Sequence, residues 1–464
     1  MVIDLGTERY EPPVDTAGPP RAVVVRQWRI AAVALAGILV LNTGGAAPAP
    51  APPLRQVYAA PIGPVDTFTM AGGLLVTASV LAGADRPGRR ITCYDLTDGH
   101  RLWSGDFIVD RDGDGPIFSD GVLLISERLA DGAPTRTTAL DPRTGRRRWS
   151  APYRPLPLPD GPIALVFDNV FRPEARIRPG RRTVGGKVYV ASDGHAYTEP
   201  PTGMTVRGLD LDTGRLRWDL PRLAGARVLE AAGGHPTILL TPSEDGGVEA
   251  RDVLSGAVTH RLDWTGGELV QAQRIGDIVV ATAHSGADLV VTAYSADLRR
   301  RRWSRSLPGP DQSVERCGPL LCQWAAFRTS ALDPATGEAR WERPGPRNLL
   351  SIGLWLVELD NGPLRRVLDA RTGRPVTDLG GWWLAGEPGW SGAGTLPADP
   401  PPLVLQPNLV KQHTWFGVFD PAGPSVRLLE VLPHSLHGCV AADRFMACRS
   451  GDGQLRVWRH EPFA

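Results

Sequence analysis

A hairpin motif that recurs along the chain most constrains its fold. The clearest copy runs from Ala331 to Trp341 and reads ALDPATGEARW. Pro334 restricts φ at the first corner of the turn, and Gly337 supplies a residue that tolerates positive φ. Trp341 then lies in the return strand. Because a lone two-stranded hairpin cannot bury a tryptophan, the motif predicts a fold in which many copies pack together.

The motif occurs eight times between Asp95 and Asp420. Four copies keep the Asp, the Gly and the Trp, whereas the other four are degraded. Their Asp positions lie about 35 to 70 residues apart, mostly near 40, which is the spacing of propeller blades. The well-kept copies end in Trp103, Trp149, Trp218 and Trp341, and the degraded copies have Trp303, His260, Thr377 and Leu428 at that position.

The string A-x-D-x-x-T-G-x-x-x-W resembles the tryptophan-docking repeat of the PQQ-type β-propeller family. That family includes quinoprotein alcohol dehydrogenases and BamB-like outer-membrane assembly lipoproteins. The resemblance implies an all-β propeller of four-stranded blades, and an apolar run near the N-terminus predicts a transmembrane helix before it. We expect eight blades, with seven as the alternative. The tryptophans expected to dock each blade on its neighbour are Trp103, Trp149, Trp218, Trp303 and Trp341.

The N-terminal region divides by composition into three segments before the repeats. We expect a disordered cytoplasmic tail over residues 1–27, a transmembrane signal anchor or signal peptide over 28–45, and an Ala/Pro linker over 46–55. The uncharged run from Ile30 to Leu41 is short for a full span. We nevertheless favour an uncleaved anchor, because a long polar extension precedes the run. The propeller would then occupy residues 56–464 outside the cytoplasm, or be secreted if the segment is cleaved.

The overall charge excludes one class of partner. The chain has 51 basic and 50 acidic side chains, a net charge of +1. Nothing in that balance calls for nucleic acid. Arginine greatly outnumbers lysine, and Ala, Gly and Pro are abundant, which is typical of a high-GC genome; we expect a membrane-anchored protein of the actinobacterial type.

Four of the five cysteines occur as two close pairs that agree with export. Cys317 and Cys322 flank a Gly-Pro turn, and Cys439 and Cys448 flank a turn at Asp443. We expect a local disulfide in each pair, because each pair would face across a hairpin. The alternative is pairs of half-buried thiols. Cys93 is expected to be a buried free thiol.

One Asp-rich loop raises the question of a metal. Asp110, Asp112 and Asp114 match the start of a D-x-D-x-D-G calcium loop. The twelfth position is Gly121 instead of the expected Glu, and Asp120 stands one residue early. A polar Asp/Gly turn between two strands explains the same residues, and we favour it. Calcium, if bound, would have a structural role.

The sequence offers no catalytic set. The resemblance to quinoprotein dehydrogenases implies axial calcium ligands, an Asp base and adjacent cysteines, and this chain has no Cys-Cys pair. We therefore assign no catalytic or cofactor-binding residue and do not expect PQQ. No G-x-S-x-G elbow supports serine hydrolysis either.

Two insertions remain as candidate surfaces. Residues 151–182 form a long arginine-rich stretch that could cover one face of the propeller, either as a binding surface or as a solvated loop. A second stretch carries Trp382, Trp383 and Trp390, which would either pack on a blade edge or form a contact patch.

We therefore expect a non-catalytic extracytoplasmic β-propeller that acts as a protein-binding or scaffold module of the cell envelope. Its partners would be unidentified envelope proteins, and the membrane through residues 28–45. The alternatives are a PQQ-dependent type of oxidoreductase and a ligand-binding sensor ectodomain.

Overall fold

The structure is a computed structural model of the 464-residue chain. The described residues are 54–460, except 82–87, 110–114, 129–134, 159–160, 178–187, 192–194, 231–235, 265, 310–311, 326–327, 345–348, 361, 387–394 and 397–400. The chain divides into two units, Met1–Pro52 and Pro53–Ala464. All described residues belong to the second unit. Among them no helix is long and apolar enough to cross a membrane, and the predicted anchor at residues 28–45 lies outside them.

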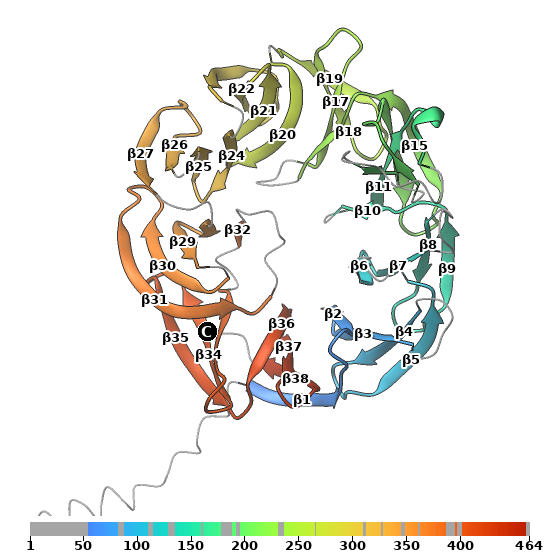
Figure 1. Cartoon of the computed structure of the whole chain (residues 1–464), viewed down its shortest axis with the longest axis vertical. Coiled ribbons are helices and arrows are strands. Elements are labelled where there is room, and N and C mark those ends of the chain that lie inside the picture. The colour runs from blue at the N-terminus through green and yellow to red at the C-terminus, as the bar shows by residue number, and fades with distance from the viewer. Residues whose placement is uncertain are drawn as a thin grey trace, which may run out of the picture. The chain divides into compact units, whose positions relative to one another are not determined.

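The second unit is built of antiparallel four-stranded sheets that follow one another around a ring (Figure 1). We number these sheets as blades 1 to 9 in chain order. Blade 1 comprises β2 (Thr67–Ala71), β3 (Leu74–Val80), β4 (Arg89–Asp95) and β5 (Arg101–Phe107). Blade 2 comprises β6 (Ile117–Ser119), β7 (Val122–Arg128), β8 (Thr135–Leu140) and β9 (Arg147–Ala151). Blade 3 comprises β10 (Leu156–Pro157), β11 (Ile163–Val170), β14 (Gly203–Asp210) and β15 (Leu216–Leu223).

The next three blades are continuous in sequence. Blade 4 comprises β16 (Arg227–Leu229), β17 (Ile238–Pro242), β18 (Val248–Asp252) and β19 (Val258–Leu262). Blade 5 comprises β20 (Glu268–Ile275), β21 (Ile278–Ser285), β22 (Asp288–Ser295) and β23 (Arg301–Leu307). Blade 6 comprises β24 (Gln312–Cys317), β25 (Leu320–Ala325), β26 (Arg328–Leu332) and β27 (Ala339–Pro344).

Blades 7 and 8 share one long strand. Blade 7 comprises β28 (Leu349–Ile352), β29 (Trp355–Leu359), β30 (Leu364–Asp369) and β31 (Pro375–Leu384). The last two residues of β31 pair with β33, so the strand also begins blade 8. Blade 8 continues with β33 (Leu403–Asn408), β34 (His413–Asp420) and β35 (Ser425–Leu432). Strand β32 (Thr395–Leu396) adds in parallel to the inner strand of blade 7.

The two ends of the second unit complete blade 9 together. Its strands are β36 (Leu436–Ala442), β37 (Phe445–Ser450), β38 (Gln454–His460) and β1 (Leu54–Pro61). Strand β1 pairs along its length with β38, so the N-terminal strand becomes the outer strand of a blade made by the C-terminus. This joint closes the ring and leaves no open end between blades 8 and 1.

The propeller expectation is confirmed, but the described residues form nine blades instead of the expected eight or seven, and blades 7 and 8 belong to one eight-stranded sheet. Each of the eight repeat hairpins joins the third and fourth strands of its own blade. Blade 9 has no such hairpin, because its third and fourth strands come from opposite ends of the unit. Counting the hairpins therefore misses the blade that the termini close.

Each well-kept blade docks on the next through its tryptophan. The indole N–H donates to the carbonyl of the residue after the next repeat Asp, and the ring lies against the turn Gly of that repeat. The hydrogen bonds run from Trp103 to Pro142 (2.8 Å), Trp149 to Leu211 (2.6 Å), Trp218 to Val253 (3.0 Å), Trp303 to Pro334 (2.9 Å) and Trp341 to Ala370 (2.8 Å). Each bond satisfies a carbonyl while it buries aromatic surface.

Other side chains take over where the repeat is degraded. Thr377 stands at the tryptophan position of blade 7, and Trp355 of β29 donates instead to the carbonyl of Pro421, at 2.7 Å. At the joint of blades 9 and 1, Tyr58 lies against Gly99 and beside Tyr94, with ring centroids 4.9 Å apart. Spacing alone did not reveal these replacements, because they come from other strands.

The repeat Asp ties its own turn together. Asp141 accepts hydrogen bonds from the backbone N–H and the hydroxyl of Thr144, at 2.9 and 2.8 Å, and pairs with Arg148 at 3.0 Å. The Arg148 guanidinium, followed by the Thr144 donors, lowers the pKa of the Asp141 carboxyl to about 2. The turn is therefore held by the ionised carboxylate.

We predict that Gly145→Ala destabilises the protein by about 3 kcal/mol, whereas Gly72→Ala costs about 1 kcal/mol. Both glycines have positive φ, 67° and 54°. A Cβ at Gly145 would come within 2.7 Å of the Trp103 ring, whereas nothing lies within 4 Å of one at Gly72. Urea unfolding of both variants measures the difference, and equal losses would contradict the docking role of the ring.

We also predict that Asp141→Asn lowers stability by about 1 kcal/mol at pH 7. The folded-state pKa of Asp141 lies below its ordinary value, so its stabilisation is present above about pH 4 and is lost as the pH falls toward 2. The difference between wild type and variant should therefore shrink over that interval. Urea unfolding at several pH values tests this, and a difference that stays constant down to pH 2 would refute it.

Candidate functional site

The two ends of each blade differ in what they expose. The turns between first and second strands, and between third and fourth strands, lie at one end, which we name the turn face. The turns between second and third strands, and the connections between blades, lie at the other end, the loop face. Strand β1 begins at the turn face, because Leu54 pairs with His460 at the end of β38.

A hollow of about 820 Å³ opens on the turn face across blades 1 to 3. Every residue of the short inner strands β6 and β10 lines it, together with the β2–β3 and β6–β7 turns. Its apolar lining includes Ile117, Phe118, Leu156 and Pro157. Leu156 is 53% exposed, which is unusual for a leucine of an inner strand. The hollow therefore presents apolar surface that the fold itself does not cover.

Charged side chains border the hollow. Asp120, Asp141, Arg143 and Arg148 line it beside the apolar strands. Arg143 pairs with Asp95 at 3.0 Å, and Arg148 reaches both Asp141 and Asp212. Asp120 has a φ of 44°, held in a two-residue turn with Gly121. An apolar floor with a polar rim is the composition of protein-binding patches and small ligand pockets.

The arginine-rich stretch differs from its expectation as one long loop. Residues 156–157 and 163–170 are β10 and β11, because these apolar residues pair within the sheet of blade 3. The insertion proper is residues 171–202 on the loop face, with η1 (Pro173–Ala175), β12 (Tyr189–Val190) and β13 (Ala196–Tyr197). Phe171 stacks on Tyr197 with ring centroids 4.2 Å apart, so part of this insertion packs on itself.

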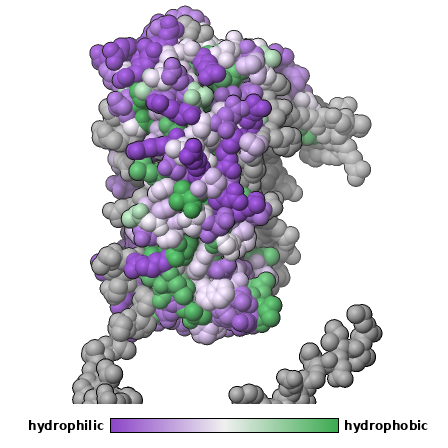
Figure 2. Space-filling view, turned by 90° about the vertical axis from the view of Figure 1, so that its left-hand side faces the viewer, coloured by the Kyte–Doolittle hydropathy of each residue, from purple (hydrophilic) through white to green (hydrophobic). Residues whose placement is uncertain are grey.

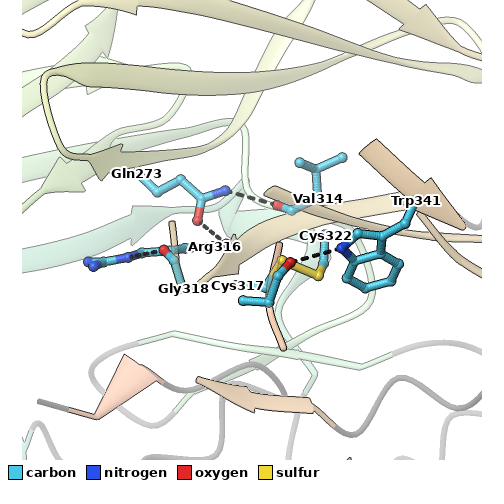
Figure 3. Close-up of a disulfide and its surroundings, with 8 residues drawn as sticks. Gln273, Val314, Arg316, Cys317, Gly318, Cys322 and Trp341 are labelled. Carbon is cyan, nitrogen blue, oxygen red and sulfur yellow. Dashed lines mark hydrogen bonds between the residues drawn. A yellow bond between two sulfur atoms is a disulfide. The ribbon is translucent and has the colours of Figure 1, made fainter. Parts of the chain in front are cut away.

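The two cysteine pairs form disulfides in the structure. Cys317–Cys322 joins the first two strands of blade 6, and Cys439–Cys448 joins those of blade 9. Figure 3 shows the first disulfide beside Trp341. There the side-chain amide of Gln273, from blade 5, donates to Val314 O at 3.2 Å and accepts from Arg316 N–H at 2.6 Å. The free Cys93 is buried, and burial raises the pKa of its thiol to about 12.

The remaining residues singled out from the sequence are the Asp-rich loop and the three tryptophans of the second insertion. Asp110, Asp112 and Asp114 lie outside the described residues, as does Trp390. Within the described part of the chain, no three His, Cys, Asp or Glu side chains gather closely enough to hold a metal ion. Trp382 packs into the core between blades 7 and 8, whereas Trp383 is 44% exposed with its ring beside Gly362.

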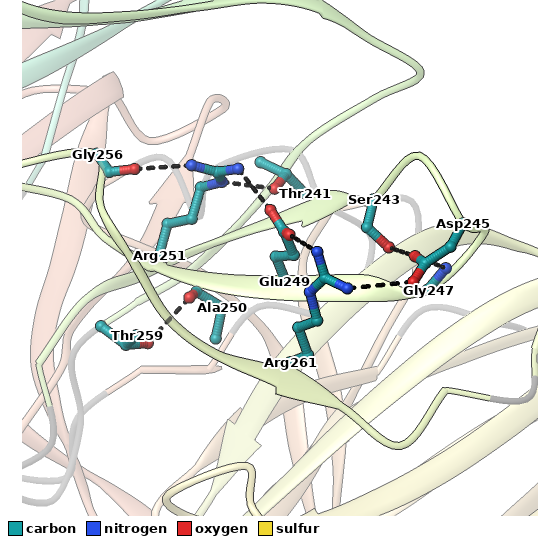
Figure 4. A network of polar contacts seen from close by, with 10 residues as sticks. All are labelled: Thr241, Ser243, Asp245, Gly247, Glu249, Ala250, Arg251, Gly256, Thr259 and Arg261. Atoms are coloured by element: carbon teal, nitrogen blue, oxygen red, sulfur yellow. Dashed lines mark hydrogen bonds and ion pairs between the residues drawn. The ribbon is translucent and has the colours of Figure 1, made fainter.

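Blade 4 also carries a network of polar contacts within its own sheet (Figure 4). His260 stands at the tryptophan position, and Arg251 donates to the carbonyl of the turn Gly256 at 2.9 Å. Glu249 is buried and pairs with Arg251 and with Arg261. The buried carboxylate is therefore paired with two arginines, which offsets the cost of removing its charge from water.

One family and two solved structures are similar to this chain. The model of a family described as outer membrane protein assembly factor BamB matches residues 63–227 and 135–365. BamB from Moraxella catarrhalis has a crystal structure similar to this chain, at 15% identity, 89% coverage of this chain, 99% of that chain and a TM-score of 0.37. The computationally designed Ika8 protein is similar at 16% identity, 76% and 100% coverage and a TM-score of 0.40. No curated protein matches the sequence.

We predict that the denatured, unreduced protein reacts with one equivalent of a thiol reagent, from Cys93, and with five equivalents after reduction. Replacing Cys317 and Cys322 by Ser should cost about 2 kcal/mol, because the short closed loop restricts the unfolded chain. Thiol titration and urea unfolding measure the two effects. Five reactive thiols before reduction would contradict the disulfides.

Proposed function

Because the chain belongs to the family of the outer membrane protein assembly factor BamB, we propose that it is a non-catalytic, extracytoplasmic protein-binding module of the cell envelope. In this proposal residues 28–45 anchor it in the membrane and the propeller carries the binding surface. A family of assembly factors supports a role in holding other proteins, since a propeller offers a rigid, broad surface.

The hollow on the turn face is the observation that carries the proposal. It combines uncovered apolar side chains with a charged rim, and its walls are rigid two-residue turns and paired strands. Such a surface binds with little loss of conformational freedom. Leu156 is the side chain best placed to contact a partner protein, because it is the most exposed of the large hydrophobic residues that line the hollow.

Two further observations support an exported propeller attached to the membrane. Disulfides persist in oxidising compartments, and two join hairpins of the propeller. Strand β1 starts at the turn face. A chain that arrives from a membrane anchor would therefore reach the propeller at the face that carries the hollow.

The test places a photo-reactive amino acid at position 156 in the full chain, expressed in its native host. We expect a discrete cross-linked envelope protein that is absent when the same group replaces Val258, an exposed residue on the outer strand of blade 4. Leu156→Asp should reduce recovery of that protein by at least about tenfold, because it places a charge in the apolar contact.

The oxidoreductase alternative is separated by adding PQQ and calcium to the purified protein. A ligand that binds the native state raises Tm, so a raised Tm with dye reduction would replace the binding proposal by an enzymatic one. Identical cross-links at positions 156 and 258, or none at either, would remove the hollow as the partner site.

A further inference from the structure

An ion pair within the repeat neutralises the hairpin turn in three blades. An arginine seven residues after the repeat Asp reaches back to that carboxylate on the turn face. The pairs are Arg148 with Asp141 at 3.0 Å, Arg217 with Asp210 at 2.5 Å, and Arg340 with Asp333. In these three blades the arginine of the hairpin is therefore neutralised by the repeat Asp of the same hairpin.

Blade 5 keeps the arginine and lacks the carboxylate. Ser295 stands at the repeat Asp position, and Arg302 stands seven residues later. The nearest ion-pair contact of Arg302 in the described residues is Asp277 at 3.9 Å, and the Asp277 side chain is 83% exposed. A contact of this length to a solvated carboxylate is weak, so Arg302 is left largely uncompensated.

The same turn also replaces its glycine by arginine. Arg299 stands four residues after Ser295, where other repeats have the turn Gly. In this turn the residue with positive φ is Leu298, at 61°, and its side chain is buried against blade 4, whereas Arg299 lies at the exposed corner. The Arg299 charge contributes to lowering the pKa of His260, after burial of the ring, which agrees with their proximity. The altered turn thus carries an additional exposed cation at the position of the usual glycine.

Four consecutive exposed arginines result, Arg299 to Arg302. Arg301 has an acidic neighbour in Asp263 at 3.5 Å. Asp297 accepts from Ser295 Oγ at 2.5 Å and from the Arg299 N–H at 3.2 Å, so its carboxylate is engaged by the turn. Figure 2, which views the left-hand edge of the ring in Figure 1, shows mainly hydrophilic side chains in the upper part of that edge.

We propose that this turn, Ser295 to Arg302, is a binding site for phosphate groups of a polyanion. Arginine presents a planar fork of donors that matches phosphate oxygens, and neighbouring arginines act together on one anionic surface. The turn belongs to the turn face, where β1 also begins. The phosphates of a phospholipid headgroup and of a phosphate polymer share the chemistry that the site recognises. This site is separate from the hollow on blades 1 to 3 and does not depend on the proposed protein partner.

The test measures binding of the purified full chain to inorganic polyphosphate by fluorescence anisotropy at several salt concentrations. We expect salt-sensitive binding, because exposed charges are screened. Arg299→Ser with Arg300→Ser should weaken it about thirtyfold. The matched control, Arg146→Ser with Arg215→Ser, removes two exposed turn arginines from blades 2 and 3 and should change affinity less than about threefold.

A second pair of variants changes no arginine. Ser295→Asp restores the repeat carboxylate beside Arg302 and should weaken polyphosphate binding about fivefold, whereas Ser295→Ala should leave it unchanged. Thermal unfolding of each variant verifies folding. No binding at low salt, equal losses in the two double variants, or no effect of Ser295→Asp would each overturn the site. If soluble dihexanoyl phosphatidylglycerol competes with polyphosphate, the natural ligand is a lipid headgroup. If it does not compete, the ligand is a phosphate polymer.

Discussion

The contact between a tryptophan of one blade and the hairpin turn of the next is the interaction on which this structure depends. The indole N–H reaches the carbonyl after the repeat Asp, and the ring occupies the space that only a glycine leaves open. Each blade therefore carries both halves of the joint. Because the same contact is made repeatedly around a ring, the loss of the motif in one repeat is tolerated when the neighbouring blades keep their contacts.

The degraded repeats show how that tolerance is used. Trp355 and Tyr58 supply an aromatic ring from other strands, and Arg274 donates to Ala296 O at 3.0 Å, the carbonyl that a tryptophan of blade 4 would have reached. Arg274 also donates to Pro236 O of the segment before β17, so it links blades 4 and 5. Blades 4 and 5 thus keep their contact without the motif, and the turn of blade 5 carries charged side chains.

Both proposed sites arise where a blade departs from the regular repeat. Short inner strands in blades 2 and 3 leave an apolar hollow, and a degraded repeat in blade 5 leaves exposed arginines without the repeat carboxylate. Both lie on the turn face, which carries the repeat hairpin turns. The turn face therefore differs locally from blade to blade, in apolar surface at blades 1 to 3 and in charge at blade 5.

The sequence by itself determined the fold class, the docking tryptophans and the two cysteine pairs, because each depends on residues close together in one hairpin. Only the tertiary structure decided the ninth blade, the roles of Trp355 and Arg274, and the location of the hollow. These features join segments far apart in the chain: β1 meets β38 only after the ring closes. Spacing records local geometry, whereas closure and exposed surface depend on which blades become neighbours.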